Sequence, residues 1–65
     1  MFEDDKLYRT DDPALNEHIG RPSTLAHWRS EGRGPKYVKL GGRVVYRGSH
    51  LNDWIEARTV ETRAA

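Results

Sequence analysis

Glycine and proline residues divide this chain into short segments, and their positions limit its possible folds more than any other feature of the sequence. Asp12 and Pro13 predict the start of a helix, because an aspartate caps free N–H groups and a proline suits the first helical position. Gly20 predicts the end of that helix, and Gly32 predicts the end of a second helix.

The second helix is expected to follow a tight turn, with Ser23 or Thr24 as its N-cap, and to run to about Glu31. Leu25 and Trp28 lie about one helical turn apart and predict its buried face. We therefore expect the tryptophan in the core and not as a platform for stacked bases.

The segment after the second helix predicts a β-hairpin. Residues 37–40 and 44–47 are rich in β-branched and aromatic residues, and Gly41-Gly42 lies between them. Because glycine tolerates positive φ at both positions, this pair is typical of a two-residue hairpin turn.

A third helix is expected from Gly48-Ser49 to about Arg58. Leu51, Trp54 and Ile55 form an apolar stripe at helical spacing along it, so they predict the side that faces the core.

The order helix, tight turn, helix, hairpin, helix predicts an α+β fold and describes a small winged helix-turn-helix with a two-stranded wing. We expect this domain to span residues 10–58. A flexible N-terminal segment at 1–9 and a flexible tail at 59–65 are expected on either side of it. Within the N-terminal segment, Leu7-Tyr8-Arg9 is expected to form a short extended piece.

Charge is distributed unevenly along the chain. Residues 21–48 contain seven basic groups and one acid, whereas residues 1–20 contain six acids and two bases, although the net charge is only +1. A segregated basic segment attracts a polyanion, because phosphates respond to the local potential and not to the charge of the whole chain. Double-stranded DNA is therefore the expected partner.

Composition argues against several other classes of function. The chain has no cysteine, which excludes disulfides and thiolate metal sites, and His18, His27 and His50 lack the spacing of a metal site. No apolar run approaches the roughly 20 residues that span a membrane. With 65 residues the interior is small. We expect a cytoplasmic protein with no cofactor, no metal, no membrane and no small-molecule ligand.

An enzyme is not expected either. Ser49, His50 and Asp53 are the residue types of a catalytic triad, but they lie within one helical turn and its cap. That arrangement predicts neither a pocket nor an oxyanion hole, so no catalytic residue is assigned.

The second helix presents small and polar side chains opposite its predicted buried face, which suits close approach to base edges in a major groove. Arg29 lies nearer the buried edge, and two roles are open for it: contact with a phosphate, or bracing of the hairpin. For the others, ordinary capping or solvent exposure is the alternative. The candidate residues of this helix are Ser23, Thr24, Ala26, His27, Arg29 and Ser30.

The hairpin and its flanks carry four bases and no acid over residues 36–47. A short ribbon tipped by Arg43 is suited to a minor groove, where narrowness strengthens the negative potential. The alternative is a solvated hairpin whose charges prevent aggregation through its edges. The candidate DNA-binding residues here are Arg21, Lys36, Lys39, Gly41, Gly42, Arg43, Tyr46 and Arg47.

Two stretches resemble the small excisionase/AlpA-like helix-turn-helix family, which is similar in fold to the DNA-binding domain of MerR-type regulators. Residues 23–35, STLAHWRSEGRGP, resemble the family's "TL..WR.EGRGP" block. Residues 38–47, VKLGGRVVYR, and the helix that follows them resemble the rest of the family pattern. The match covers about residues 10–58.

This resemblance implies a DNA-binding protein of a phage or another mobile element, acting at the bacterial nucleoid. It implies that helix 23–31 enters a major groove and that the Gly41-Gly42-Arg43 tip reaches an adjacent minor groove. By the same likeness, Arg29, Arg43 and Tyr46 would be backbone or wing contacts.

Three functions stay open at this point. The first is an excisionase-type recombination directionality factor that binds and bends attachment-site DNA to assist an integrase, with neighbouring copies binding cooperatively. The second is a small AlpA-like transcription regulator, which needs the same domain. The third, from another class, is a protein-interaction module whose basic hairpin binds an acidic partner.

Overall fold

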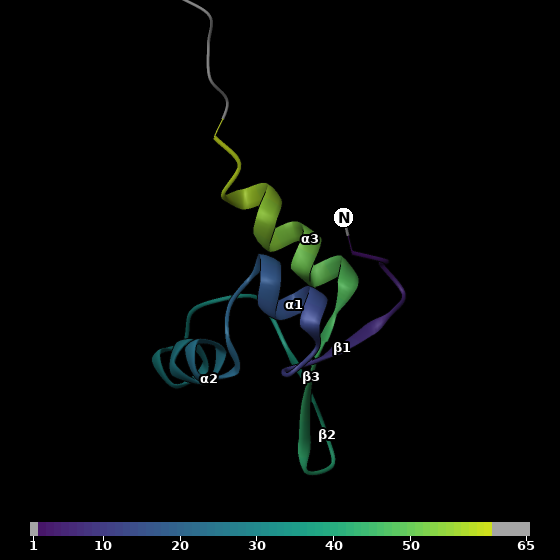
Figure 1. Ribbon diagram of the computed structural model, residues 1–65, viewed down its shortest axis with the longest axis vertical. Helices are drawn as coiled ribbons and strands as arrows, with labels where there is room; N and C mark the ends of the chain where they lie inside the picture. Colours follow the sequence, from purple (N-terminus) through teal and green to yellow (C-terminus); the bar gives the residue numbers. More distant parts are fainter. Residues whose placement is uncertain (1, 61–65) are drawn as a thin grey trace, which may run out of the picture.

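A computed structural model describes residues 2–60 of the chain and contains three helices and one small sheet (Figure 1). The elements in chain order are β1 (Leu7–Arg9), α1 (Pro13–His18), α2 (Pro22–Glu31), β2 (Val38–Leu40), β3 (Arg43–Arg47) and α3 (Gly48–Ala57). The strands form an antiparallel sheet in the order β1-β3-β2, so β3 is central. The predicted α+β class is confirmed, and the sheet has one strand more than the expected two.

The additional strand belongs to the N-terminal segment, where the expectation of flexibility over residues 1–9 is wrong for residues 2–9. Strand β1 pairs with β3, and Tyr8 lies opposite Tyr46. Phe2 and Tyr8 are buried, with their ring centroids 5.0 Å apart in an edge-on arrangement. The short extended piece expected at residues 7–9 is thus a strand of the sheet.

Contacts with α3 hold this segment in place. The Asn52 side chain accepts a hydrogen bond from the Phe2 N–H at 3.0 Å and donates one to the Phe2 carbonyl at 2.8 Å. The Gly48 N–H donates to the carbonyl of Lys6 at 2.8 Å. A Cβ atom at Gly48 would overlap the carbonyl oxygen of Glu3, so only glycine allows this close approach of two backbones.

Helix α1 begins as the sequence predicts. The Asp12 carboxylate accepts hydrogen bonds from the N–H groups of Ala14 at 2.9 Å and Leu15 at 3.4 Å. Pro13 occupies the first turn. Helix α1 ends after His18, one residue earlier than expected.

The start of α2 differs from prediction, whereas α3 begins at Gly48 as expected. Helix α2 begins at Pro22 with Arg21 as its N-cap, so Ser23 and Thr24 lie inside its first turn. Helix α3 begins at Gly48, and neither helix has a side-chain cap. A proline whose φ already suits a helix shifts the start of α2 ahead of the better capping side chains.

The core lies between the sheet and the helices and takes a side chain from nearly every element. Leu15, Leu25 and Leu51 have no exposed surface, and each such burial contributes roughly 1.5–3 kcal/mol. Ile19 and Ile55 pack against them from the edge. The buried cluster consists of Phe2, Tyr8, Leu15, Leu25, Tyr46 and Leu51.

The two tryptophans lie at the edge of this core. Both are half-buried, and their ring centroids are 5.4 Å apart. Trp28 packs against the buried cluster as expected. Trp54, expected in the core, instead has the guanidinium of Arg58 over its ring at 3.9 Å. Of the tail expected over residues 59–65, only 59 and 60 are described; the other residues lie outside the described part of the chain.

Candidate nucleic-acid interface

Helix α2 divides into a buried and an exposed side as predicted. Leu25 is completely buried and holds the helix against the core. Figure 1 shows α2 at the edge of the molecule, to one side of the β2–β3 hairpin. Among the candidate residues, Ser23, Ala26, His27 and Ser30 are exposed, and Thr24 and Arg29 are half-buried.

The C-terminal end of α2 carries a small polar cluster around Glu31. The His27 ring nitrogen lies 3.2 Å from this carboxylate, and Arg33 Nε lies 2.9 Å from it. The Ser30 hydroxyl donates to the His27 carbonyl at 2.8 Å. Exposed pairs of this kind contribute only about 0–1 kcal/mol, so they leave both side chains available to an incoming ligand.

The structure shows one of the two roles that the sequence left open for Arg29. Its Nη1 donates a hydrogen bond of 2.8 Å to the hydroxyl of Tyr46 on β3, which is the bracing contact. Tyr46 itself is only 1% exposed, because it lies on the central strand and faces the core. The expectation that Tyr46 contacts DNA is therefore wrong, since its side chain has no free surface to offer.

The turn of the hairpin is formed by two glycines, as predicted, between the paired residues Leu40 and Arg43. Gly41 has a positive φ of 60°, whereas Gly42 does not need one. A Cβ at either glycine would meet nothing within 4 Å, so the space on that side of each residue is open. A second surface could therefore approach the tip backbone closely.

The strand register divides the basic residues of the hairpin between its two faces. Cross-strand partners share a face, and successive residues alternate. Lys39 is paired with Val44 and lies on the face that carries Tyr46. Arg43 and Arg47 lie on the opposite face. The sequence analysis treated these basic residues as one group. A two-residue turn nevertheless fixes the register of the strands, and with it the face on which each residue lies.

A basic residue on the same face was missed. Arg9 on β1 is opposite Val45, which places it on the face of Arg43 and Arg47. Its exposed side chain lies 3.6 Å from the Asp11 carboxylate. The signal in the sequence was the extended piece expected at Leu7-Tyr8-Arg9, because alternate residues of a strand share a face.

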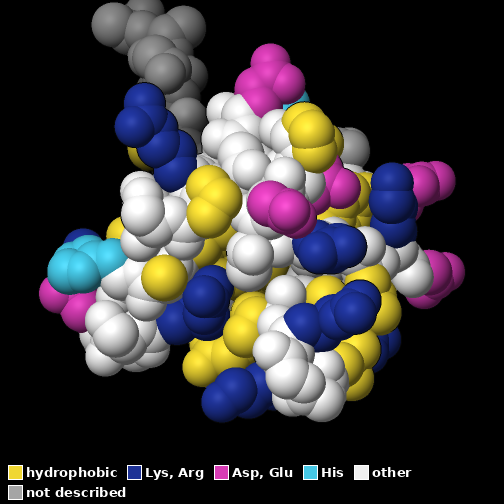
Figure 2. All heavy atoms as spheres, turned by 60° about the horizontal axis from the view of Figure 1, so that its bottom comes forward, with side chains coloured by type: hydrophobic (Ala, Val, Ile, Leu, Met, Phe, Trp, Pro, Cys, Tyr) yellow, Lys and Arg dark blue, Asp and Glu magenta, His cyan; other side chains and the backbone are white. Residues whose placement is uncertain are grey.

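The basic side chains of the hairpin are exposed and gather at one end of the molecule. Figure 2 shows Lys and Arg side chains around the hairpin end, interspersed with hydrophobic ones. Within residues 2–60 no ion pair involves Lys39, Arg43 or Arg47. Their charges are thus available to an anionic partner, as are those of exposed Arg21 and Lys36.

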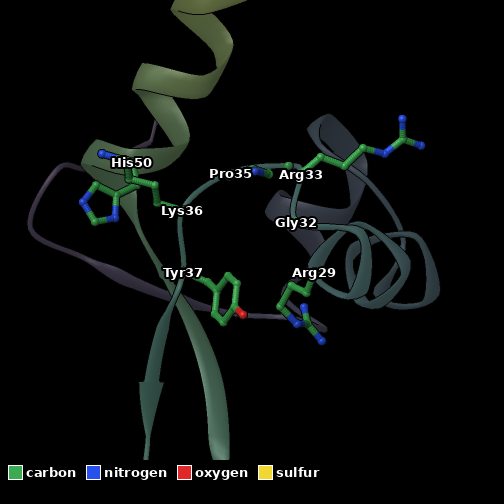
Figure 3. Close-up of a pocket in the computed structure, with 8 residues that line it drawn as sticks. Arg29, Gly32, Arg33, Pro35, Lys36, Tyr37 and His50 are labelled. Carbon is green, nitrogen blue, oxygen red and sulfur yellow. The ribbon is translucent and has the colours of Figure 1, made fainter.

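A hollow of about 440 Å³ lies between the end of α2 and the start of the hairpin. Figure 3 shows that its basic groups diverge: Arg33 points away from it, and Lys36 and His50 lie together on the α3 side. The groups therefore do not converge on one small anion. The residues that line it are Arg29, Gly32, Arg33, Gly34, Pro35, Lys36, Tyr37 and His50.

The loop above this hollow is fixed to α2. Gly32 ends the helix with a φ of 72°, as predicted, and the Arg33 N–H donates to the Trp28 carbonyl at 2.9 Å. Gly34 has a φ of 92°, and a Cβ there would lie 2.9 Å from the Trp28 ring. The loop thus rests on the indole, which limits how the hairpin can move relative to α2.

Comparisons of this chain with protein-family models, curated proteins and solved structures gave no match. Its function is therefore inferred from its own residues. No helix within residues 2–60 has both the length and the hydrophobicity that crossing a membrane requires.

Proposed function

We propose that this protein is a sequence-preferring DNA-binding protein with the architecture of a small winged helix. In this proposal α2 enters a major groove, and the β2–β3 hairpin lies along the adjacent minor groove. The observation that carries it is the position of an exposed, polar helix face beside a hairpin whose exposed cations form no ion pair within the described residues.

The arrangement of α1 and α2 supports the assignment of α2 as the recognition helix. Only residues 19–21 separate the two helices, and Gly20 lies in this turn. Helices joined by a turn of this length, often with a glycine, are typical of helix-turn-helix units, in which the second helix contacts the bases.

The distribution of charge supports DNA as the partner. Six of the seven basic residues in the range 21–48 are exposed, and the exception is the half-buried Arg29. Contacts between such cations and phosphates release counterions, so the affinity must fall as salt is added. The exposed small side chains of α2, Ser23 and Ala26 among them, permit approach to base edges.

Within this class we propose an excisionase-type directionality factor that binds and bends attachment-site DNA to assist an integrase. The support is the resemblance of residues 23–35 and 38–47 to the excisionase/AlpA-like pattern. A small transcription regulator would use the same surface, and the two functions differ in where and how many copies bind.

The test is a titration of the protein against DNA duplexes that tile its upstream region and the nearest integrase attachment site, at two salt concentrations. Saturable binding to a subset of tiles, with a log–log salt slope of about −0.9 per phosphate contact, is expected. Stepwise loading at the attachment site supports the directionality factor, and a single promoter site supports the regulator. Absence of duplex binding at low salt would overturn the proposal in favour of an acidic protein partner.

A further inference from the structure

One half-buried arginine connects the two elements of the proposed interface. Arg29 belongs to α2, and its Nη1 donates a hydrogen bond of 2.8 Å to the hydroxyl of Tyr46 on β3. Its guanidinium carbon lies 5.7 Å from the ring centroid of Tyr37, just before β2. Figure 3 shows the Arg29 and Tyr37 side chains pointing toward one another. A single side chain of α2 therefore contacts both arms of the hairpin.

We infer that Arg29 fixes the angle between α2 and the hairpin, and that discrimination between DNA sequences depends on this brace. The inference rests on the proposed function, because it concerns how the two DNA-contacting elements are held relative to one another. In this role Arg29 is a positioning residue, and its partner is the Tyr46 hydroxyl and not a phosphate.

The acceptor of this hydrogen bond is held rigidly. Tyr46 is 1% exposed and lies on the central strand, opposite Tyr8 of β1. Its ring centroid is 6.2 Å from that of Tyr37. A hydroxyl on a buried ring offers a fixed point to which a neighbouring helix can be attached.

The donor, the Arg29 guanidinium, is also suited to fix the angle between α2 and the hairpin. A guanidinium is planar and combines directed N–H groups with stacking on aromatic rings, whereas an ammonium is a flexible point charge. Within residues 2–60 no ion pair competes for Arg29. The two tyrosines therefore set its orientation.

The length of the hairpin converts a small change at this brace into a large displacement at the tip. From Tyr46 to Gly41 the chain runs five residues, about 16 Å at the usual rise of a strand. A rotation of about 10° at the brace would move the tip by roughly 3 Å over that length. Adjacent bases on one strand are about 3.4 Å apart, so such a rotation misplaces the wing by nearly one base.

The test uses Tyr46→Phe, which removes the hydroxyl and keeps the buried ring, and Arg29→Lys, which keeps the charge and loses the planar fork. Affinity is measured for the tile bound best and for its scrambled sequence, at two salt concentrations. For both variants the ratio of specific to scrambled affinity is expected to fall roughly fivefold, the factor that one net hydrogen bond represents. The salt slope is expected to stay unchanged.

The matched control is Tyr37→Phe, which keeps the ring beneath the guanidinium and removes a hydroxyl for which the structure shows no hydrogen bond to Arg29. It is expected to bind both duplexes like the wild type. A further variant, Arg29→Gln, distinguishes the two roles of the arginine. A salt slope smaller by about 0.9 in Arg29→Gln, with Tyr46→Phe unchanged, would make Arg29 a phosphate contact and overturn the inference.

A measurement without DNA separates failure of this inference from failure of the proposed function. Residual dipolar couplings of the free protein report the orientation of α2 relative to β3, and a change is expected in Tyr46→Phe but not in Tyr37→Phe. Identical orientations in the wild type and Tyr46→Phe would overturn the brace. Absence of DNA binding by the wild type would instead overturn the proposed function, and the couplings would still decide whether the brace exists.

Discussion

Strands β1 and β2 flank the same central strand, β3, yet the two edges of the sheet are built in opposite ways. On the β1 side the segment that leads into the strand is fixed in place: the Asn52 side chain hydrogen-bonds the Phe2 backbone, and Gly48 allows the close approach of Glu3. The β2 edge ends in an open tip, where a Cβ at Gly41 or Gly42 would meet nothing within 4 Å. The central strand β3 is therefore anchored on its β1 side, whereas on its other side it forms with β2 a hairpin whose charged tip is free.

The largest expected effect comes from removing the aromatic anchor of the fixed edge. Phe2→Ala should lower the free energy of unfolding by about 3 kcal/mol, because the ring is nearly completely buried in the core. A domain of this size has about 3–5 kcal/mol in total, so the variant should retain only about 0–2 kcal/mol and be close to its unfolding midpoint at 25 °C. Urea unfolding followed by circular dichroism measures this, with the exposed Val60→Ala as control. A stability within about 0.5 kcal/mol of the wild type would show that the N-terminal segment is not anchored.

A matched pair of glycine substitutions compares the two edges directly. Gly48→Ala should cost about 1–3 kcal/mol, because its Cβ overlaps the Glu3 carbonyl and the N-terminal segment must move. Gly42→Ala, at the open tip, should change stability by no more than about 0.5 kcal/mol. Thermal unfolding of both variants measures the difference. Equal costs at the two positions would contradict the distinction between a fixed edge and a free one.

Charge removal should have a different consequence at each edge. Arg43→Ala should weaken binding to most duplexes and reduce the salt slope by about 0.9 or less, without loss of stability. Lys6→Ala removes the same charge beside β1 and should leave both the affinity and the slope unchanged. Fluorescence anisotropy at several salt concentrations provides the measurement. An equal loss in the two variants would mean that net charge, and not the hairpin, attracts the DNA.

The most local effect is expected from a single side chain on α2. His27→Ala should reduce discrimination between the preferred site and its variants, by about 1–3 kcal/mol at one base pair, with little change in affinity for scrambled DNA. Competition binding against duplexes with single substitutions tests this. The same loss on preferred and scrambled duplexes would remove His27 from base reading.

Local signals were enough to predict most of the elements. Asp12 and Pro13 give a helix start from capping geometry alone, and Gly41-Gly42 gives a hairpin turn from backbone freedom alone. Leu25 and Leu51 follow from helical spacing, and both prove to be completely buried. These features depend on residues at most one turn apart, so the sequence carries them directly.

The features that the sequence did not predict depend on distant residues. The hydrogen bonds between Asn52 and Phe2 join positions 50 residues apart, and no local sequence pattern predicts them. The burial of Tyr46 depends on β1 lying beside β3 and on the helices that cover that face. In the proposed site, the basic residues of the hairpin were predicted from the composition of that segment. Their division between two faces required the pairing partners.

The pairing of Phe2 with Asn52 also affects the order in which the protein can form during synthesis. Phe2 and Tyr8 are made before their partners on β3 and α3, which follow 38 to 50 residues later. At roughly 5–20 residues per second, a ribosome needs several seconds to cover that distance. Through this interval Phe2 and Tyr8 lack β3 and α3 as partners, so a nascent chain leaves these aromatic rings incompletely covered until α3 has emerged.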